Sequence, residues 1–150
     1  MRCLGMAAIR ELARDDWDDW RALWAGYLAF YRAELADETS RATFERLCTG
    51  DGGMFGLIAV DDTGRGVGMA NCVVHASTWS ELPTCYLEDL FVAPSARGGR
   101  AGRALLEAVG RAARARGADR TYWHTQAYNG RARSLYDTVG RSTSFIVYEM

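Results

Sequence analysis

The chain has 150 residues, of which 49% are hydrophobic and 25% charged, the composition of an ordinary globular protein with one buried core. No apolar run approaches the roughly 18 residues that a membrane-spanning helix needs. The first residues also lack the long apolar stretch of a signal peptide. We therefore expect a single domain over residues 1–150, located in the cytoplasm and without a membrane partner.

Charges are divided unevenly along the chain, although the net charge is only −1. Residues 1–96 hold 8 Arg and 15 acidic residues, a net charge of −7, whereas residues 97–141 hold 10 Arg and 3 acidic residues, a net charge of +7. The slightly acidic total argues against nucleic acid as a partner. The basic second part can attract a small polyanionic ligand.

The first part of the chain predicts a strand, two helices and a hairpin. Aromatic residues recur at spacings of three and four along the first helix and form one apolar stripe. The two strands of the hairpin flank a turn rich in Asp and Gly. The expected elements are a strand at 7–13, a helix from Asp15 or Asp16 to about Tyr31, a helix at 37–48, and strands at 54–60 and 67–77.

The second part alternates strands and helices. A strand, a helix and a second strand between 85 and 126 imply two parallel strands joined by a right-handed crossover. With the first part, this order predicts an α/β fold with a mixed sheet and helices on both faces. The expected elements are strands at 85–92, 120–126 and 144–149, and helices at 100–116 and 129–139.

Cysteines and histidines do not predict a metal site. The cysteines, at positions 3, 48, 72 and 85, have no Cys-x-x-Cys spacing, and His75 and His124 lie in no metal-ligand pattern. Cys72 and Cys85 lie in apolar, strand-like context. We therefore interpret the cysteines as buried, reduced thiols rather than disulfides, metal ligands or a nucleophile.

Residues 85–104 predict a phosphate site, because an Arg/Gly cluster directly precedes a long helix. The N–H groups at a helix start lack intrahelical partners, the helix dipole makes that end positive, and glycines let a bulky anion approach. A Walker loop is excluded because the chain has no Lys. The Rossmann fingerprint fits poorly, because a loop at 94–96 separates the strand from Gly98, Gly99 and Gly102.

Residues 85–149 resemble the GNAT superfamily of acetyl-CoA-dependent N-acetyltransferases, and look most like its polyamine and histone-type amine acetyltransferases. The implied GNAT fold has a mixed, mostly antiparallel central sheet, splayed parallel strands and helices on both faces. The resemblance is carried by Tyr-Leu-Glu-Asp-Leu-Phe-Val at 86–92, Arg-Gly-Gly-Arg-Ala-Gly at 97–102, Tyr-Trp-His-Thr-Gln at 122–126, and Asn129 followed seven residues later by Tyr136.

This resemblance implies acetyl-CoA as cosubstrate and no metal. The pantetheine arm is expected to pair with the backbone of Leu90, Phe91 and Val92 between the splayed strands, and Asn129 to touch CoA. The family signature has Gly where this chain has Arg100. Arg100 either contacts a CoA phosphate, which we favour, or crowds the site. The residues expected around the pyrophosphate are Arg97, Gly98, Gly99, Arg100, Ala101, Gly102 and Arg103.

The same resemblance implies two catalytic residues. Tyr136 would protonate the departing thiolate, and Glu88 would hold the acceptor amine or take its proton through water. Alternatively, Tyr136 is a core aromatic and Glu88 forms a structural ion pair with an Arg. Because adjacent residues of a regular strand face opposite sides, we assign Asp89 to structure.

An acceptor site is expected beside the first two helices and strand 85–92, with Tyr31 as a contact and Tyr27, Phe30 and Trp79 as further candidates for its wall. With no cysteine nucleophile, the prediction is direct acetyl transfer to a primary amine in a ternary complex. A protein acetyltransferase acting on Lys side chains or amino termini, and a non-catalytic acyl-CoA sensor, stay open as alternatives. Dimerisation is common in the family, and the apolar residues 145–148 are candidates to take part.

Overall fold

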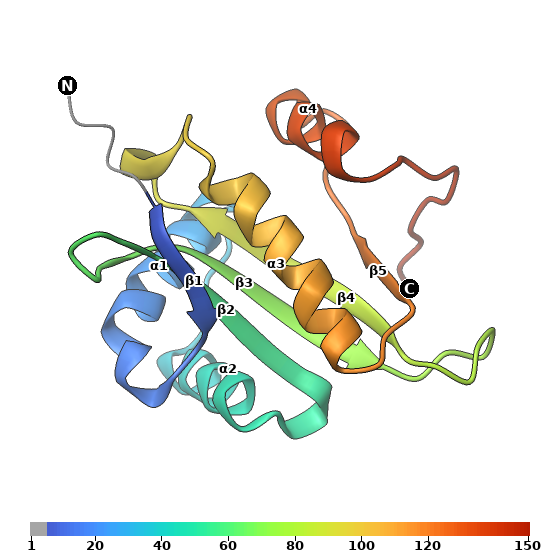
Figure 1. Cartoon of the computed structure of the whole chain (residues 1–150), viewed down its shortest axis with the longest axis horizontal. Helices are drawn as coiled ribbons and strands as arrows, with labels where there is room; N and C mark the ends of the chain where they lie inside the picture. The colour runs from blue at the N-terminus through green and yellow to red at the C-terminus, as the bar shows by residue number, and fades with distance from the viewer. Residues whose placement is uncertain (1–5) are drawn as a thin grey trace.

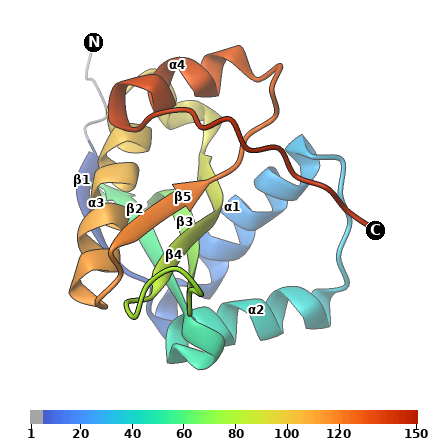
Figure 2. The ribbon, with the colours of Figure 1, turned by 90° about the vertical axis from the view of Figure 1, so that its right-hand side faces the viewer.

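The computed structural model describes residues 6–150. Its centre is a five-stranded sheet in the order β1-β2-β3-β4-β5, with α1 and α2 on one face and α3 on the other (Figures 1 and 2). Its helices and strands are β1 (Met6–Glu11), α1 (Trp17–Phe30), α2 (Asp37–Thr49), β2 (Met54–Asp61), β3 (Gly66–His75), β4 (Thr84–Val92), α3 (Ala101–Ala115), β5 (Arg120–Trp123) and α4 (Gly130–Val139).

The sheet has the mixed topology expected from the sequence. Strands β1 to β4 pair antiparallel in chain order, and β4 pairs with β5 in parallel after the crossover through α3. This confirms the α/β class and the parallel pair. Strand β5 ends at Trp123, before the expected end of that strand at 126, and it lies at one edge of the sheet.

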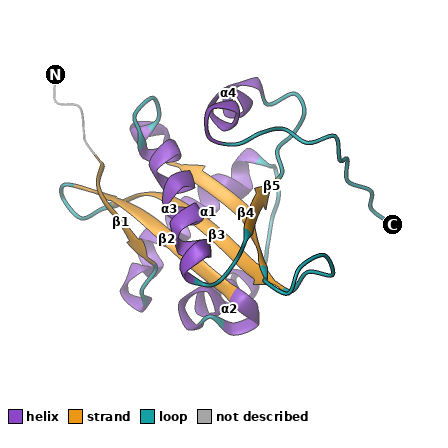
Figure 3. Cartoon of the chain, turned by 45° about the vertical axis from the view of Figure 1, so that its right-hand side comes forward, coloured by secondary structure: helices purple, strands orange, loops and turns teal. Residues whose placement is uncertain are grey.

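The strand expected at 144–149 is wrong, because residues 141–150 form no regular structure. Phe145, Ile146, Val147 and Tyr148 are 65–86% exposed. An apolar run becomes a strand only where a partner edge is available for its backbone. Here the chain leaves α4 and runs outward to the C-terminus without pairing with β5 (Figure 3).

Two apolar cores hold the helices to the sheet. On one face, Trp20 and Trp24 of α1 and Phe44 of α2 pack on Ile58 and Met69. On the other face, the apolar side of α3 packs on alternate residues of β2, β3 and β4, and α4 covers the end of this layer. Burial of these apolar surfaces is the main stabilising contribution to the fold.

A bidentate ion pair fixes the entry into α1. The Arg10 guanidinium donates to both carboxylate oxygens of Asp16, at 2.7 and 2.8 Å, and Asp16 Oδ2 also accepts from the backbone N–H of Ala13 at 2.7 Å. Asp16 is buried, and its hydrogen bonds with Arg10 hold the pKa of its carboxyl below the usual range. The predicted helix start at Asp15 or Asp16 is therefore accurate to within two residues.

Within residues 6–150, no helix combines the length and hydropathy that crossing a membrane requires. The same residues contain no group of three or more His, Cys, Asp or Glu side chains placed to hold a metal ion. Cys72 and Cys85 are buried free thiols, as expected, and Cys48 is a half-buried free thiol. Cys3 lies outside the described residues.

Candidate active site

Strand β4 loses its parallel partner halfway along its length. Pairing with β5 runs from Thr84–Arg120 to Leu87–Trp123 and then stops, whereas pairing with β3 continues to Val92. The N–H of Ala93 donates to the carbonyl of Val67 at 2.8 Å. Because such bonds alternate along an antiparallel ladder, the backbone groups of Leu90 and Val92 point away from β3, into the gap beyond the end of β5.

Within residues 6–150, the Leu90 backbone and the Val92 N–H thus present unpaired peptide groups of the kind that the amides of a pantetheine arm need, whereas the Val92 carbonyl accepts from Arg97 Nε at 3.0 Å. Phe91 differs from its two neighbours. Its backbone faces β3, and its ring packs against α1, where a Cβ on Gly26 would come within 2.8 Å of it. Of the three expected residues, Leu90 and Val92 are placed for backbone pairing, and Phe91 is a packing residue.

At the start of α3, a run of backbone N–H groups has no backbone partner within the described chain. The N–H of Arg97 donates to Pro94, and the next such bond is from Ala104 to Arg100, which leaves the N–H groups of residues 98–103 open. Gly98 has a φ of +83°, and no atom lies within 4 Å of the position of a Cβ there. This helix start therefore fits a pyrophosphate.

The three arginines around this helix start differ in their partners. Arg97 Nε donates to the Val92 carbonyl at 3.0 Å, and its guanidinium lies 5.3 Å from the centre of the Phe91 ring. Arg103 bonds Glu107 at 3.0 Å and Thr138 of α4 at 3.4 Å. Arg100 is exposed and, within residues 6–150, has no side-chain partner. Arg100 is thus the arginine most free to meet a phosphate.

A cavity of about 730 Å³ lies beside this loop, between it, α1 and the β2–β3 turn. Its lining includes Arg97 and Arg100 of the loop, Phe91 of β4, and Gly26 and Phe30 of α1. Neither β5 nor α4 contributes to its wall. Phe30 therefore lines the loop cavity, which is separate from the gap between β4 and β5.

Tyr136 of α4 stands at the level where β4 and β5 separate. Its ring lies edge-on to Trp123, the last paired residue of β5, with centroids 5.6 Å apart. Its hydroxyl makes no hydrogen bond within the described chain, and burial raises the pKa of the phenol. Tyr136 is therefore a protonated donor at neutral pH, although its ring also packs on the core.

Asn129 begins α4, as expected of a helix cap. Its Oδ1 accepts from the N–H of Ala132 at 3.3 Å, and its side-chain amide nitrogen stays available for another partner. Gly102 of α3 lets α4 approach, because a Cβ there would come within 3.2 Å of Leu135. The packing of α3 against α4 therefore positions both Asn129 and Tyr136.

An irregularity in β4 changes the roles expected of Glu88 and Asp89. Opposite the adjacent residues Asn71 and Cys72, β4 places Asp89 and Leu87, so Glu88 is an extra residue, a β-bulge. Leu87 packs with the α3 core, whereas Asp89 accepts a hydrogen bond from Asn71 at 3.1 Å, on the α1 face. The regular alternation from which Asp89 was assigned to structure is therefore interrupted at Glu88.

Glu88 is exposed and lies beside two stacked tyrosines. Burial first, and then the charge of Glu88, raises the pKa of Tyr86, and burial chiefly raises that of Tyr122. The two rings stack with centroids 4.9 Å apart. Glu88 has no ion pair with an Arg in residues 6–150, so the alternative of a structural ion pair has no support.

The Tyr86–Tyr122 stack is part of a group that the sequence reasoning missed. His75 Nε2 lies 2.9 Å from the Tyr122 hydroxyl, and His124 Nδ1 lies 3.3 Å from that of Tyr86. In the sequence, the one signal for this group is the alternation along the expected strand at 120–126, which places Tyr122 and His124 on the same face.

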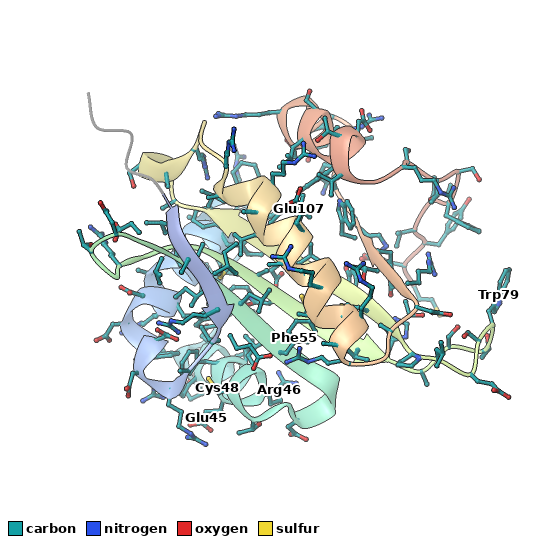
Figure 4. The ribbon with its side chains drawn as sticks, in the orientation of Figure 1. Glu45, Arg46, Cys48, Phe55, Trp79 and Glu107 are labelled. Atoms are coloured by element: carbon teal, nitrogen blue, oxygen red, sulfur yellow. The ribbon has the colours of Figure 1, made fainter. Side chains whose placement is uncertain are left out.

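Among the residues expected in the acceptor wall, Tyr27 and Tyr31 pack together on α1 with ring centroids 4.9 Å apart. Burial first, and then the charge of Asp89, raises the pKa of Tyr31. After burial, Tyr31 adds to the raised pKa of Tyr136. Trp79 projects from the tip of the β3–β4 loop and is 93% exposed (Figure 4), a position that does not support a role in the wall.

Comparison with known proteins agrees with this geometry. The model of the acetyltransferase (GNAT) family matches residues 8–140. The D-amino-acid N-acetyltransferase HPA3 of Saccharomyces cerevisiae is 31% identical over 142 residues, which cover 94% of this chain and 88% of that protein.

Solved structures show the same fold. An aminoglycoside N-acetyltransferase, AAC(6')-Iy in complex with CoA, superposes with a TM-score of 0.84 at 22% identity, covering 97% of this chain and 95% of that one. A ribosomal-protein-alanine N-acetyltransferase of Brucella melitensis biovar Abortus 2308 superposes with a TM-score of 0.76 at 20% identity, covering 95% and 97%. With its splayed strands and open helix start, this chain belongs to the GNAT family of N-acetyltransferases, with acetyl-CoA as cosubstrate.

Proposed function

We propose that this chain, acting as one domain over residues 1–150, transfers acetyl from acetyl-CoA to a primary amine by direct attack in a ternary complex. The observation that carries the proposal is a convergence at one level of the sheet. Pairing of β4 with β5 ends at Leu87 and Trp123, Glu88 follows Leu87 directly, and the Tyr136 ring contacts Trp123. The gap for the cosubstrate, a carboxylate and a phenol thus lie together.

Acetyl-CoA supplies a thioester carbon and a sulfur leaving group. Before attack, an alkylammonium with a pKa of roughly 10 must lose a proton, and Glu88 accepts it through water. The amine nitrogen then bonds to the thioester carbon as the carbon–sulfur bond breaks. Tyr136 donates its phenolic proton to the sulfur, so CoA leaves as a thiol. Of the two protons left on the nitrogen, the amide keeps one, and the other returns through water to the Tyr136 phenolate.

For the acceptor, we propose a small cationic amine. Residues 1–96, which form α1, α2 and most of the sheet, carry a net charge of −7, which suits a cation. The named activities of relatives point to small amines, because one is a D-amino-acid N-acetyltransferase and another an aminoglycoside N-acetyltransferase. Polyamines, which the sequence resemblance favoured, belong to the same chemical class.

A thiol-release assay tests this function. Purified protein is given acetyl-CoA with polyamines, D- and L-amino acids, aminoglycosides, or peptides with free Lys or amino-terminal groups, and released CoA is measured against a no-acceptor blank. We expect release with at least one small amine. Release with peptides alone would replace the small-amine proposal by a protein acetyltransferase, and no release with any amine would refute acetyl transfer to amines.

We also propose that the chain forms a homodimer in which residues 145–148 take part. Four consecutive large apolar residues are exposed there, and β5 is an edge strand within residues 6–150. Such an apolar patch is typical of an interface. Light scattering of the full chain should give twice the mass of one protomer, and Ile146→Asp should reduce it. A monomer at tens of micromolar would contradict this proposal.

A further inference from the structure

Asp89 is a carboxylate to which the sequence assigned only a structural role. Its side chain is half-buried on the α1 face, because the bulge at Glu88 reverses the alternation of β4. Without the bulge, Asp89 would share a face with Leu87 and point into the apolar core under α3. The register of the sheet thus delivers this carboxylate to the acceptor side.

Neighbouring residues aim the Asp89 carboxylate but do not neutralise it. Trp20 Nε1–H donates to Asn71 Oδ1 at 3.1 Å, which turns the Asn71 amide nitrogen toward Asp89 Oδ2 at 3.1 Å. The Tyr27 hydroxyl also acts to lower the pKa of the Asp89 carboxyl, although burial outweighs it. Asn71 and Tyr27 are neutral groups on β3 and α1, and the hydrogen bond from Asn71 orients the carboxylate.

No cation balances this charge. The chain has 18 Arg, yet within residues 6–150 none forms an ion pair with Asp89. Charges removed from water are normally paired, because an unpaired one loses its hydration without compensation. Burial accordingly raises the pKa of Asp89. A half-buried carboxylate without a cation is therefore expected to find one in a ligand.

On the basis of the proposed function, we infer that Asp89 binds the ammonium group of the acceptor beside the packed rings of Tyr27 and Tyr31, and that Glu88 takes the proton. The ligand class is a primary ammonium on an alkyl stem. Tyr27 and Tyr31 offer aromatic surface to the stem and the cation. Exposed Glu88, in contrast, has direct access to the water that must carry a proton away.

A purely structural role for Asp89 predicts the opposite effect on stability. If the charged carboxylate of Asp89 only stabilises its contacts with Asn71 and Tyr27, Asp89→Asn should lower the melting temperature. If the charge instead binds a ligand, Asp89→Asn should stabilise the ligand-free protein. The raised pKa of Asp89 means that folding disfavours the ionised carboxylate. Asn at this position also keeps an oxygen that can accept from Asn71 and Tyr27.

The test compares Asp89→Asn with the matched neighbour Glu88→Gln, using whichever amine shows turnover with the wild-type protein. For Asp89→Asn we expect the KM for the amine to rise about 10- to 100-fold, because the variant loses one charge-assisted hydrogen bond to the ammonium group. Its kcat should stay within a few-fold, its KM for acetyl-CoA should not change, and its melting temperature should be equal or higher. For Glu88→Gln we expect mainly a lower kcat.

An amine KM within twofold of wild type in Asp89→Asn, or a lower melting temperature, would overturn the inference. A second measurement does not depend on that variant. In Glu88→Gln, which keeps Asp89 beside Tyr27 and Tyr31, the amine KM should rise on the acid side as Asp89 takes up a proton, and a flat profile would contradict the inference. Absence of turnover in the wild-type protein would instead defeat the proposed function itself.

Discussion

Replacing Tyr136 by Phe isolates the chemistry of one hydroxyl group. The ring keeps its edge-on contact with Trp123, at 5.6 Å, and its packing against the α3 core. The hydroxyl has no hydrogen-bond partner in residues 6–150, so its removal leaves no buried group unsatisfied. We therefore expect the melting temperature and the affinity for acetyl-CoA to stay near their wild-type values.

Turnover should fall strongly, because the departing sulfur would lose its proton donor. Proton transfer from a positioned side chain typically accelerates a reaction about 10²- to 10⁴-fold, so we expect kcat of Tyr136→Phe to drop at least about 100-fold. The raised pKa of Tyr136 means that the wild-type phenol stays protonated across neutral pH. The deficit of the variant should therefore be constant from pH 6 to pH 9.

The assay is CoA release under saturating acetyl-CoA and amine, with acetyl-CoA binding measured separately by calorimetry. Tyr148→Phe is a matched control, because it removes a phenolic hydroxyl from the exposed C-terminal segment. A kcat for Tyr136→Phe within twofold of wild type would refute the assignment. A parallel loss of acetyl-CoA binding would show that the residue packs rather than donates a proton.

Three further predictions concern the helix start and the entry to α1. Arg100→Ala and Arg100→Gly should each weaken CoA binding about fivefold to tenfold in calorimetry, since an exposed guanidinium contributes about 1 kcal/mol; binding at wild-type strength in both would show that Arg100 has no phosphate role. Gly98→Ala should also weaken CoA binding and cost about 1 kcal/mol of stability, because its φ is +83°; an unchanged melting temperature would contradict this. Asp16→Asn should lower the free energy of unfolding at pH 7 by about 2 kcal/mol, reduced from the full value of a buried pair by the 47% exposure of Arg10. Because the folded-state pKa of Asp16 is lowered, this difference should shrink as the pH falls through that pKa, and denaturant titrations at pH 7 and pH 3 would show whether it does.

Sequence alone located most elements of this fold, because each carries a local signal that the tertiary structure leaves intact. The second helix, expected at 37–48, runs from Asp37 to Thr49 and ends at Gly50, whose φ of +80° allows a left-handed cap. The hairpin of β2 and β3 follows from a turn at Asp61, whose carboxylate binds the N–H groups of Thr63 and Arg65. Open backbone groups at the start of α3 follow from helix geometry itself.

Features that depend on distant partners were not predictable in this way. Residues 144–149 have the pattern of a strand, but a strand also needs an edge, and the sequence does not show that β5 pairs only with β4. Trp79 is a large apolar residue near expected site strands, yet the β3–β4 loop carries it outward. Local composition shows that an apolar residue favours burial against other apolar groups. Whether this chain provides those groups depends on the tertiary fold.

The bulge at Glu88 is the clearest example of a feature that the sequence does not predict. It concerns both the cosubstrate gap and the side of the sheet on which we propose that the acceptor binds. A β-bulge adds local twist to its strand, and pairing of β4 with β5 stops at Leu87, directly before it. That twist accounts for the gap that the backbone of Leu90 and the N–H of Val92 face. The same extra residue turns Asp89 from the α3 core to the α1 face. A bulge at this position therefore places the gap beyond β5 next to the carboxylate that we propose as the acceptor ligand. Deleting Glu88 should remove both features, whereas Glu88→Gln should preserve both.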